Sequence, residues 1–119
     1  MSMPPPDDHS ALLDIQHYCQ QILSTLDRPL DAGEQIPTLV LDAAIERWLT
    51  VVGEAVKRLS MELREAHPEV PWKGWAGLRD ILVHAYDEVS VAELRRITEV
   101  DVAALLAAVE ALLTGYSEA

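Results

Sequence analysis

The sequence predicts an all-α protein, an antiparallel bundle of four or five helices. Apolar residues recur at intervals of three and four along most of the chain, which is the period of an amphipathic helix. The composition agrees, because the apolar residues are mostly Leu, Ala, Val and Ile, Gly is scarce and Phe is absent. No segment shows the polar and apolar alternation of a half-buried strand. With 119 residues, the chain has the size of one ordinary domain.

The first helix is expected to follow a Pro-rich, acidic tail of residues 1–9. The run Pro4-Pro5-Pro6 favours an extended form, so we expect it to stay outside the helix. Asp8 or Ser10 could cap the helix that follows. Its apolar stripe consists of Leu12, Ile15, Cys19, Ile22, Leu23 and Leu26.

A long second helix is predicted after a loop from Arg28 to Pro37. Thr38 is a plausible cap, and the pattern continues to about Ala66. Gly53 lies inside this helix, where glycine costs about 1 kcal/mol relative to Ala. We therefore expect Gly53 to contact another backbone closely. The inner stripe comprises Leu41, Ile45, Trp48, Leu49, Val52, Val56, Leu59 and Leu63.

The rest of the chain predicts two further helices. The segment "HPEVPWKGW" is typical of a turn, and Pro71 can occupy the first turn of a third helix that continues to about Tyr86. Ser90 and Glu93 fit a capping box at the start of the last helix. That helix should reach Leu113, with a kink or restart over residues 98–101. We therefore predict one helical domain over residues 10–114 and a C-terminal tail over residues 115–119.

Charge and composition limit the partners. The formal net charge is −11 and the pI about 4.5, which argues against non-specific electrostatic binding of nucleic acid. A local phosphate site formed by one or two arginines remains compatible with this charge. Cys19 is the single cysteine, so neither an internal disulfide nor a cysteine-based zinc site is indicated. Neither a membrane span nor a signal peptide is evident. We expect a cytoplasmic protein that uses no cofactor and no metal and binds neither DNA nor a membrane.

The stretch "GLRDILVHAYDEVS" places four polar side chains in an apolar segment. On an ideal helix, Arg79 and Tyr86 share one face, and Asp80 and His84 share another, so Asp80 could orient His84. Arg79 and His84 lie about 140° apart by the same geometry. They could still act together if the Arg79 side chain swings, if the helix loosens near His84, or if two copies of the chain meet here.

Arginine and histidine together could cleave RNA without a metal. Arginine offers a permanently charged fork of donors for a phosphate, and histidine moves protons near neutral pH. One histidine cannot easily serve as both base and acid in one step. A symmetric dimer would supply a second His84.

Structural alternatives exist for each of these residues. Arg79 could simply pair with Glu54 or Glu88, and Tyr86 could be a core aromatic residue. A lone histidine on a helix is more often structural than catalytic, and R-x4-H is a weak pattern by itself. Trp72 and Trp75 could stack a base, but packing in the core or at an interface is favoured.

Three segments resemble the HEPN superfamily and, within it, the HepT-like group also known as DUF86. "VVGEAVKRLSMELREAHPEVPW" resembles the long second helix of the group with its Gly-Glu-Ala element. "GLRDILVHAY" resembles its R-x4-H-x-Y motif, and "EVSVAELRRI" the polar start of its next helix. The resemblance extends from about Leu12 to Leu113. Asp80 stands where many members have Asn.

The resemblance implies the toxin of a type VII-like toxin–antitoxin system. Such a protein would be a dimeric, metal-independent endoribonuclease, with Arg79 and His84 catalytic at a cleft between protomers. Asp80 would support them, as would Glu54, whose alternative is a surface charge. A partner nucleotidyltransferase of the MNT type, the antitoxin, would attach AMP to Tyr86. A non-catalytic helical module that binds this partner or a nucleotide is the alternative, and the net charge favours it slightly.

Overall fold

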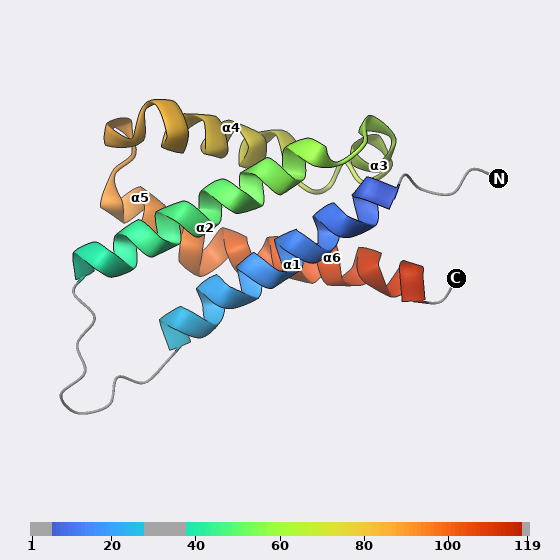
Figure 1. Cartoon of the computed structure of the whole chain (residues 1–119), viewed down its shortest axis with the longest axis horizontal. Helices are drawn as coiled ribbons and strands as arrows, with labels where there is room; N and C mark the ends of the chain where they lie inside the picture. Colours follow the sequence, from blue (N-terminus) through green and yellow to red (C-terminus); the bar gives the residue numbers. More distant parts are fainter. Residues whose placement is uncertain (1–5, 28–37, 118–119) are drawn as a thin grey trace.

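The computed structural model describes residues 6–27 and 38–117 of the chain. Four longer helices lie side by side, and each runs antiparallel to the helix on which it packs (Figure 1). The described ranges contain no strand, so the predicted all-α bundle is confirmed. The four helices are α1 (Pro6–Asp27), α2 (Thr38–Arg58), α4 (Trp72–His84) and α6 (Val102–Ser117).

Shorter elements join the long helices. The segment α3 (Met61–Ala66) connects α2 to α4, and a single 3-10 turn, η1 (Tyr86–Glu88), follows α4. The helix α5 (Val91–Arg96) continues through a π-helical turn, η2 (Ile97–Asp101), into α6. In this turn the Val102 N–H donates to the Ile97 carbonyl, which inserts one extra residue into the helical repeat. The irregularity expected near residues 98–101 is therefore present.

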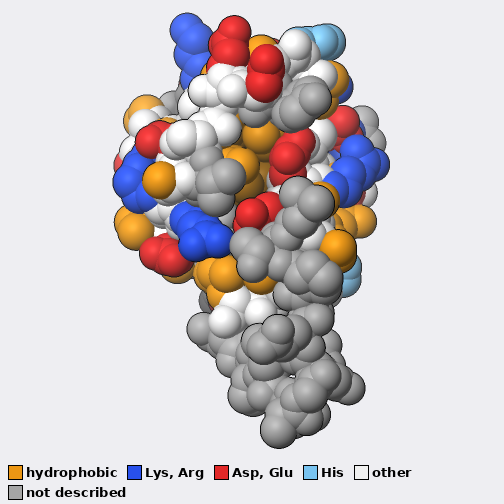
Figure 2. Space-filling view, turned by 90° about the vertical axis from the view of Figure 1, so that its left-hand side faces the viewer, with side chains coloured by type: hydrophobic (Ala, Val, Ile, Leu, Met, Phe, Trp, Pro, Cys, Tyr) orange, Lys and Arg blue, Asp and Glu red, His pale blue; other side chains and the backbone are white. Residues whose placement is uncertain are grey.

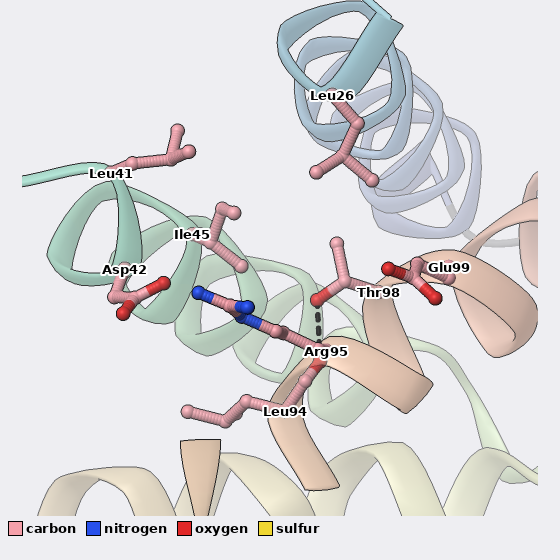
Figure 3. Close-up of a pocket in the computed structure, with 8 residues that line it drawn as sticks. All are labelled: Leu26, Leu41, Asp42, Ile45, Leu94, Arg95, Thr98 and Glu99. Carbon is pink, nitrogen blue, oxygen red and sulfur yellow. Dashed lines mark hydrogen bonds between the residues drawn. The ribbon is translucent and has the colours of Figure 1, made fainter. Parts of the chain in front are cut away.

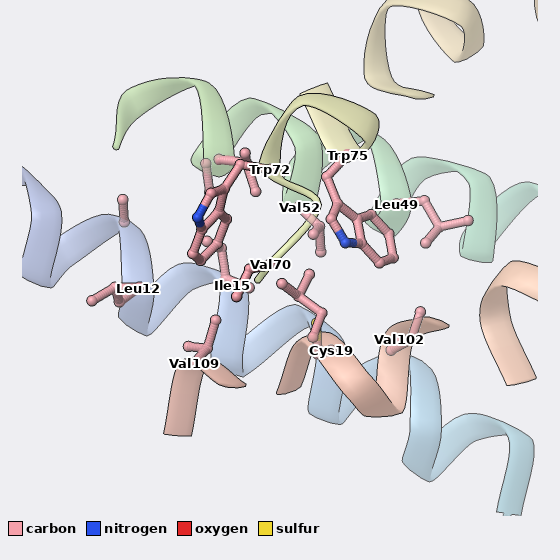
Figure 4. Close-up of a cluster of buried hydrophobic side chains, with 14 of the residues drawn as sticks. Leu12, Ile15, Cys19, Leu49, Val52, Val70, Trp72, Trp75, Val102 and Val109 are labelled. Carbon is pink, nitrogen blue, oxygen red and sulfur yellow. The ribbon is translucent and has the colours of Figure 1, made fainter. Parts of the chain in front are cut away.

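The core fills the space between α1, α2, α4 and α6 (Figure 4). Trp72 and Trp75 are 4% and 5% exposed, and the Trp72 Nε1–H donates to the His67 carbonyl at 3.0 Å. Both tryptophans therefore pack in the core, as favoured from the sequence. The fully buried side chains of largest volume include Leu12, Ile15, Ile22, Leu49, Val52, Val56, Val102 and Val109.

The expected second helix is two helices, because the chain breaks after Arg58. The Ser60 Oγ accepts from the Leu63 N–H at 3.1 Å and caps α3. The Asp8 carboxylate accepts from the Ser60 N–H and from the Ser60 Oγ–H, both at 2.7 Å. A side chain distant in sequence thus stabilises the break, and periodicity alone predicted an uninterrupted helix to Ala66 incorrectly.

The start of α1 also differs from the prediction. The helix begins at Pro6, which is compatible with a first helical position because its missing N–H has no partner to lose there. Asp8 lies inside the helix and is only 2% exposed, so it does not cap α1. Residues 1–5 and the expected loop over 28–37 lie outside the described residues. None of the helices described is long and apolar enough to cross a membrane.

Candidate active site

Gly53 brings α2 and α4 into close contact. A Cβ at Gly53 would overlap the Cβ of Arg79 and lie 2.8 Å from the Trp75 carbonyl oxygen. No side chain larger than hydrogen fits at this position without a shift of one helix. The expected close approach is confirmed, and it places Arg79 directly against α2.

A network of four charged side chains lies along the α2–α4 contact. The Asp80 Oδ1 accepts from the Lys57 Nζ at 2.8 Å and from the Arg79 Nη1 at 3.1 Å. The Arg79 Nη2 lies 3.6 Å from the Glu54 Oε1. Two cations and two carboxylates therefore alternate across the two helices, and Glu54 contacts Arg79 as predicted.

Electrostatics favour the ionised form of Asp80. The hydrogen bond from Lys57 holds the pKa of this carboxyl below its ordinary value, and the hydrogen bond from Arg79 acts in the same direction. The Asp80 side chain is 50% exposed, so water still reaches it. The carboxylate is charged near neutral pH and open to exchange with other anions.

The Arg79 guanidinium is the most enclosed member of the network. Its side chain is 24% exposed, against 44% for Lys57 and 41% for Glu54. The Arg79 Nε is buried and has no hydrogen-bond partner within the described part of the chain. Buried donors without partners are rare in folded proteins. Arg79 is thus held firmly by packing, with its hydrogen-bonding capacity incompletely used.

His84 is the last residue of α4, and its side chain is exposed. The Ala85 N–H donates to the Ile81 carbonyl at 2.7 Å, and Ala85 leaves the helical conformation with φ −149° and ψ 43°. The prediction that this helix continues to Tyr86 is therefore wrong.

The end of α4 changes the predicted grouping of the motif. Tyr86 begins η1, so ideal-helix geometry no longer places it on the face of Arg79, and its side chain lies outside the described residues. Asp80 pairs with Lys57 and Arg79 instead of His84. No hydrogen bond or ion pair reaches the His84 imidazole from the side chains that the structure describes.

Lys57 is the member of this site that the sequence analysis did not single out. It lies one helical turn after Gly53, and this spacing directs it toward the helix that Gly53 contacts. Together with Gly53, this spacing could have identified Lys57. A lysine within a predicted amphipathic helix is, however, usually a solvated surface residue.

A separate pocket lies at the other end of α2 (Figure 3). Leu26, Leu41, Ile45 and Leu94 form its apolar walls, and Asp42, Arg95, Thr98 and Glu99 complete its lining. None of the motif residues contributes to it. The Thr98 hydroxyl donates back to the Leu94 carbonyl at 2.6 Å, beside the π-helical turn. The pocket and the charged network are thus distinct features.

Surface charges are mixed at the end of the bundle where α4 terminates. Figure 2 shows acidic and basic side chains interspersed there around apolar ones. Arg96 pairs with Glu93 at 2.9 Å and lies 3.6 Å from Asp101, so its charge is compensated locally. No cluster of three or more potential metal-ligating side chains occurs among the described residues.

Comparison with known proteins gives consistent matches. The family model described as Ribonuclease HepT-like matches residues 15–112. A "Putative RNase" of Methanocaldococcus jannaschii is 38% identical over 84 residues, which are 71% of this chain and 72% of that protein. A "Putative RNase" of Caldanaerobacter subterraneus subsp. tengcongensis is 55% identical over 74 residues, 60% and 66% of the two chains.

A third relative is the "Probable ribonuclease HepT" of Thermococcus cleftensis, which is 39% identical over 62 residues, 52% of this chain and 56% of that protein. No solved structure gives a significant match. The matched range of the family model contains the whole charged network and His84. The chain therefore belongs to the Ribonuclease HepT-like family.

Proposed function

We propose that this protein is a metal-independent endoribonuclease, the toxin of a type VII-like toxin–antitoxin system in the cytoplasm. The observation that carries the proposal is the combination of a packed Arg79 with an exposed His84 on one helix. Membership of the Ribonuclease HepT-like family supports RNA as the substrate. The site residues are Arg79 and His84, with Asp80 and Glu54 as positioning residues.

The chemistry follows from the two side chains. A neutral His84 takes the proton of the ribose 2′-OH, whose oxygen attacks the adjacent phosphorus. The bond from phosphorus to the 5′ oxygen breaks, and an imidazolium returns a proton to this oxygen. The products are a 2′,3′-cyclic phosphate and a 5′-OH. Arg79 stabilises the negative charge that develops on the phosphoryl oxygens.

A homodimer supplies the second histidine. Each protomer offers one His84, and the base and the acid come from the two copies. Ile81 and Val83, close to His84 in sequence, are 42% and 44% exposed although both are apolar. Burial of these side chains against a second copy would be favourable. The exposed apolar residues on α4 therefore support a dimer with the two histidines at its interface.

Modification of Tyr86 silences the enzyme in this proposal. The antitoxin, an MNT-type nucleotidyltransferase, attaches AMP to the Tyr86 hydroxyl. Tyr86 is two residues after His84 in the sequence, and the phosphate of the attached AMP is negatively charged. We propose that this phosphate competes with RNA for Arg79. Intact mass and tryptic mapping test this step. AMP found exclusively on peptides without Tyr86 would contradict it.

Cleavage of RNA by matched variants tests the main proposal. In a buffer with chelator, the unmodified wild type should cut single-stranded RNA, and Arg79→Ala or His84→Ala should reduce kcat by about 10²-fold or more. His67→Ala is the control, because His67 follows the end of α3, lies 3.4 Å from Glu69, and belongs to none of the elements that carry the proposed site residues. Circular dichroism checks that each variant remains helical.

Mixed dimers distinguish the two-histidine mechanism from a monomer mechanism. Wild-type chain mixed with an excess of His84→Ala chain should lose more activity than its dilution explains, because a mixed dimer holds one His84 in place of two, whereas a monomer mechanism would leave the activity per wild-type chain unchanged. Wild-type protein of confirmed unmodified mass that cuts no RNA would leave the alternative, a non-catalytic module that binds the nucleotidyltransferase. The net charge of −11 favours this alternative.

A further inference from the structure

One oxygen of Asp80 holds two cations together. The Asp80 Oδ1 accepts from the Lys57 Nζ on α2 at 2.8 Å. It also accepts from the Nη1 of Arg79, the residue before Asp80 on α4, at 3.1 Å. An anionic oxygen between a lysine ammonium and an arginine guanidinium is an arrangement that also suits a phosphate oxygen. Lys57 and Asp80 are about half exposed, so a ligand from solution can reach both.

We propose that Lys57 and Arg79 form a two-cation site for an RNA backbone phosphate, and that the Asp80 carboxylate occupies this site when RNA is absent. The inference rests on the proposed function and adds Lys57 to its binding residues. RNA displaces the carboxylate, and the two cations transfer from Asp80 to the phosphate. Lys57 and Arg79 thus have an anionic partner both in the free protein, where it is the Asp80 carboxylate, and in the complex, where it is the phosphate.

The position of the site relative to His84 determines its role. Asp80 lies one helical turn before His84, about 6 Å along the helix axis. Lys57 contacts the turn of α4 around Asp80, whereas His84 terminates the helix. Lys57 therefore binds the phosphate next to the scissile one and does not touch the reacting atoms, and the Arg79 guanidinium, with its five N–H donors, contacts both phosphates. Its loss should weaken substrate binding and leave the chemical step nearly unchanged.

Arg58 provides a closely matched control for Lys57. The two residues are neighbours on α2, and their side chains are 46% and 44% exposed. Each makes an ion pair with one aspartate, Arg58 with Asp14 at 2.6 Å and Lys57 with Asp80 at 2.8 Å. Lys57→Gln and Arg58→Gln thus remove the same charge and the same kind of contact, at different places on the helix.

Steady-state cleavage of a short single-stranded RNA separates the two variants. Lys57→Gln should raise KM about fivefold with kcat within about twofold of the wild type, which is the signature of lost uniform binding. Lys57→Arg should restore KM because it keeps the charge. Arg58→Gln should leave both constants unchanged. Equal KM values for Lys57→Gln and Arg58→Gln would overturn the proposal.

RNA binding by the His84→Ala protein tests the site without cleavage. In this background, Lys57→Gln should reduce the slope of log Kd against log salt concentration by about 0.7, the value for one phosphate contact on a single strand. Asp80→Asn should tighten binding about threefold, since an uncharged amide competes less strongly for the cations. An unchanged slope, or weaker binding by Asp80→Asn, would contradict the exchange.

The two proposals fail in different ways. Active wild-type enzyme whose RNA affinity is independent of Lys57 retains the proposed function and removes the two-cation site. Binding that depends on Lys57, without any cleavage, removes the ribonuclease proposal and retains the site. No binding of RNA by the His84→Ala protein, together with no cleavage by the wild type, overturns both.

Discussion

Two aspartates connect helices in this protein, and their surroundings are opposite. Asp8 is 2% exposed and accepts two hydrogen bonds from the neutral groups of Ser60. The Asp80 side chain is 50% exposed and accepts hydrogen bonds from two cations. Asp8 joins the start of α1 to the α2–α3 junction, whereas Asp80 joins α2 to α4 at the candidate active site.

The difference separates a structural contact from an exchangeable one. Asp8 is buried and its partner Ser60 is only partly exposed, so the Ser60 N–H and hydroxyl would find few replacement acceptors if the carboxylate were removed. The partners of Asp80 face water and can be solvated or can bind another anion. Burial with neutral donors therefore favours stability, and exposure with charged donors favours ligand binding.

Loss of the Asp8 carboxylate should have the largest effect on stability. Asp8→Ala leaves the Ser60 N–H and hydroxyl without their acceptor, which should lower the free energy of unfolding by about 2–3 kcal/mol. Urea denaturation followed by circular dichroism measures this. Asp14→Ala is the control, because Asp14 belongs to an exposed pair with Arg58 and should cost at most about 1 kcal/mol. Equal costs would remove the distinction between the two environments.

Substitution of Gly53 should have a somewhat smaller effect on stability and a larger one on the site. Gly53→Ala forces α2 away from Arg79 and Trp75, so we expect a loss of about 1–3 kcal/mol and reduced RNA cleavage. Gly77→Ala, for which the added Cβ meets nothing within 4 Å, should be neutral or stabilising by up to about 1 kcal/mol. Urea denaturation compares the stability of the two variants, and the RNA-cleavage assay compares their activity. A Gly53→Ala protein as stable and active as Gly77→Ala would contradict the close contact.

The smallest expected effect is a shift in the titration of Asp80. Its pKa lies below the ordinary aspartate value, chiefly because of Lys57, so Lys57→Gln should raise it and Arg58→Gln should not. Because the folded-state pKa is lowered, the stabilising contribution is present above the unfolded-state pKa and disappears as the pH falls through the folded-state value. Carboxyl NMR titration measures the midpoint. If Lys57→Gln leaves the titration midpoint of Asp80 unchanged, Lys57 is not the cause of the lowered pKa.

Much of the candidate site could be predicted from short-range patterns. The glycine inside an amphipathic helix predicted the close contact at Gly53, because such a residue is unfavourable without a packing reason. The resemblance to the R-x4-H-x-Y motif predicted Arg79 and His84 as site residues, although helical spacing alone placed them about 140° apart, and Glu54 was expected beside Arg79. These predictions depend on residues within a few helical turns, where periodicity is informative.

The sequence by itself determined the all-α architecture and the apolar faces, since both follow from local spacing along the chain, and its resemblance to the HepT-like group indicated the motif residues. Only the tertiary structure decided that α2 ends at Arg58, that α4 ends at His84, and that Lys57 shares the Asp80 oxygen with Arg79. For the end of α2 and the shared oxygen, the physical reason is that both involve side chains from different helices. The break before α3 requires Asp8, which lies 52 residues from Ser60, and the two-cation site requires α2 and α4 to meet at Gly53.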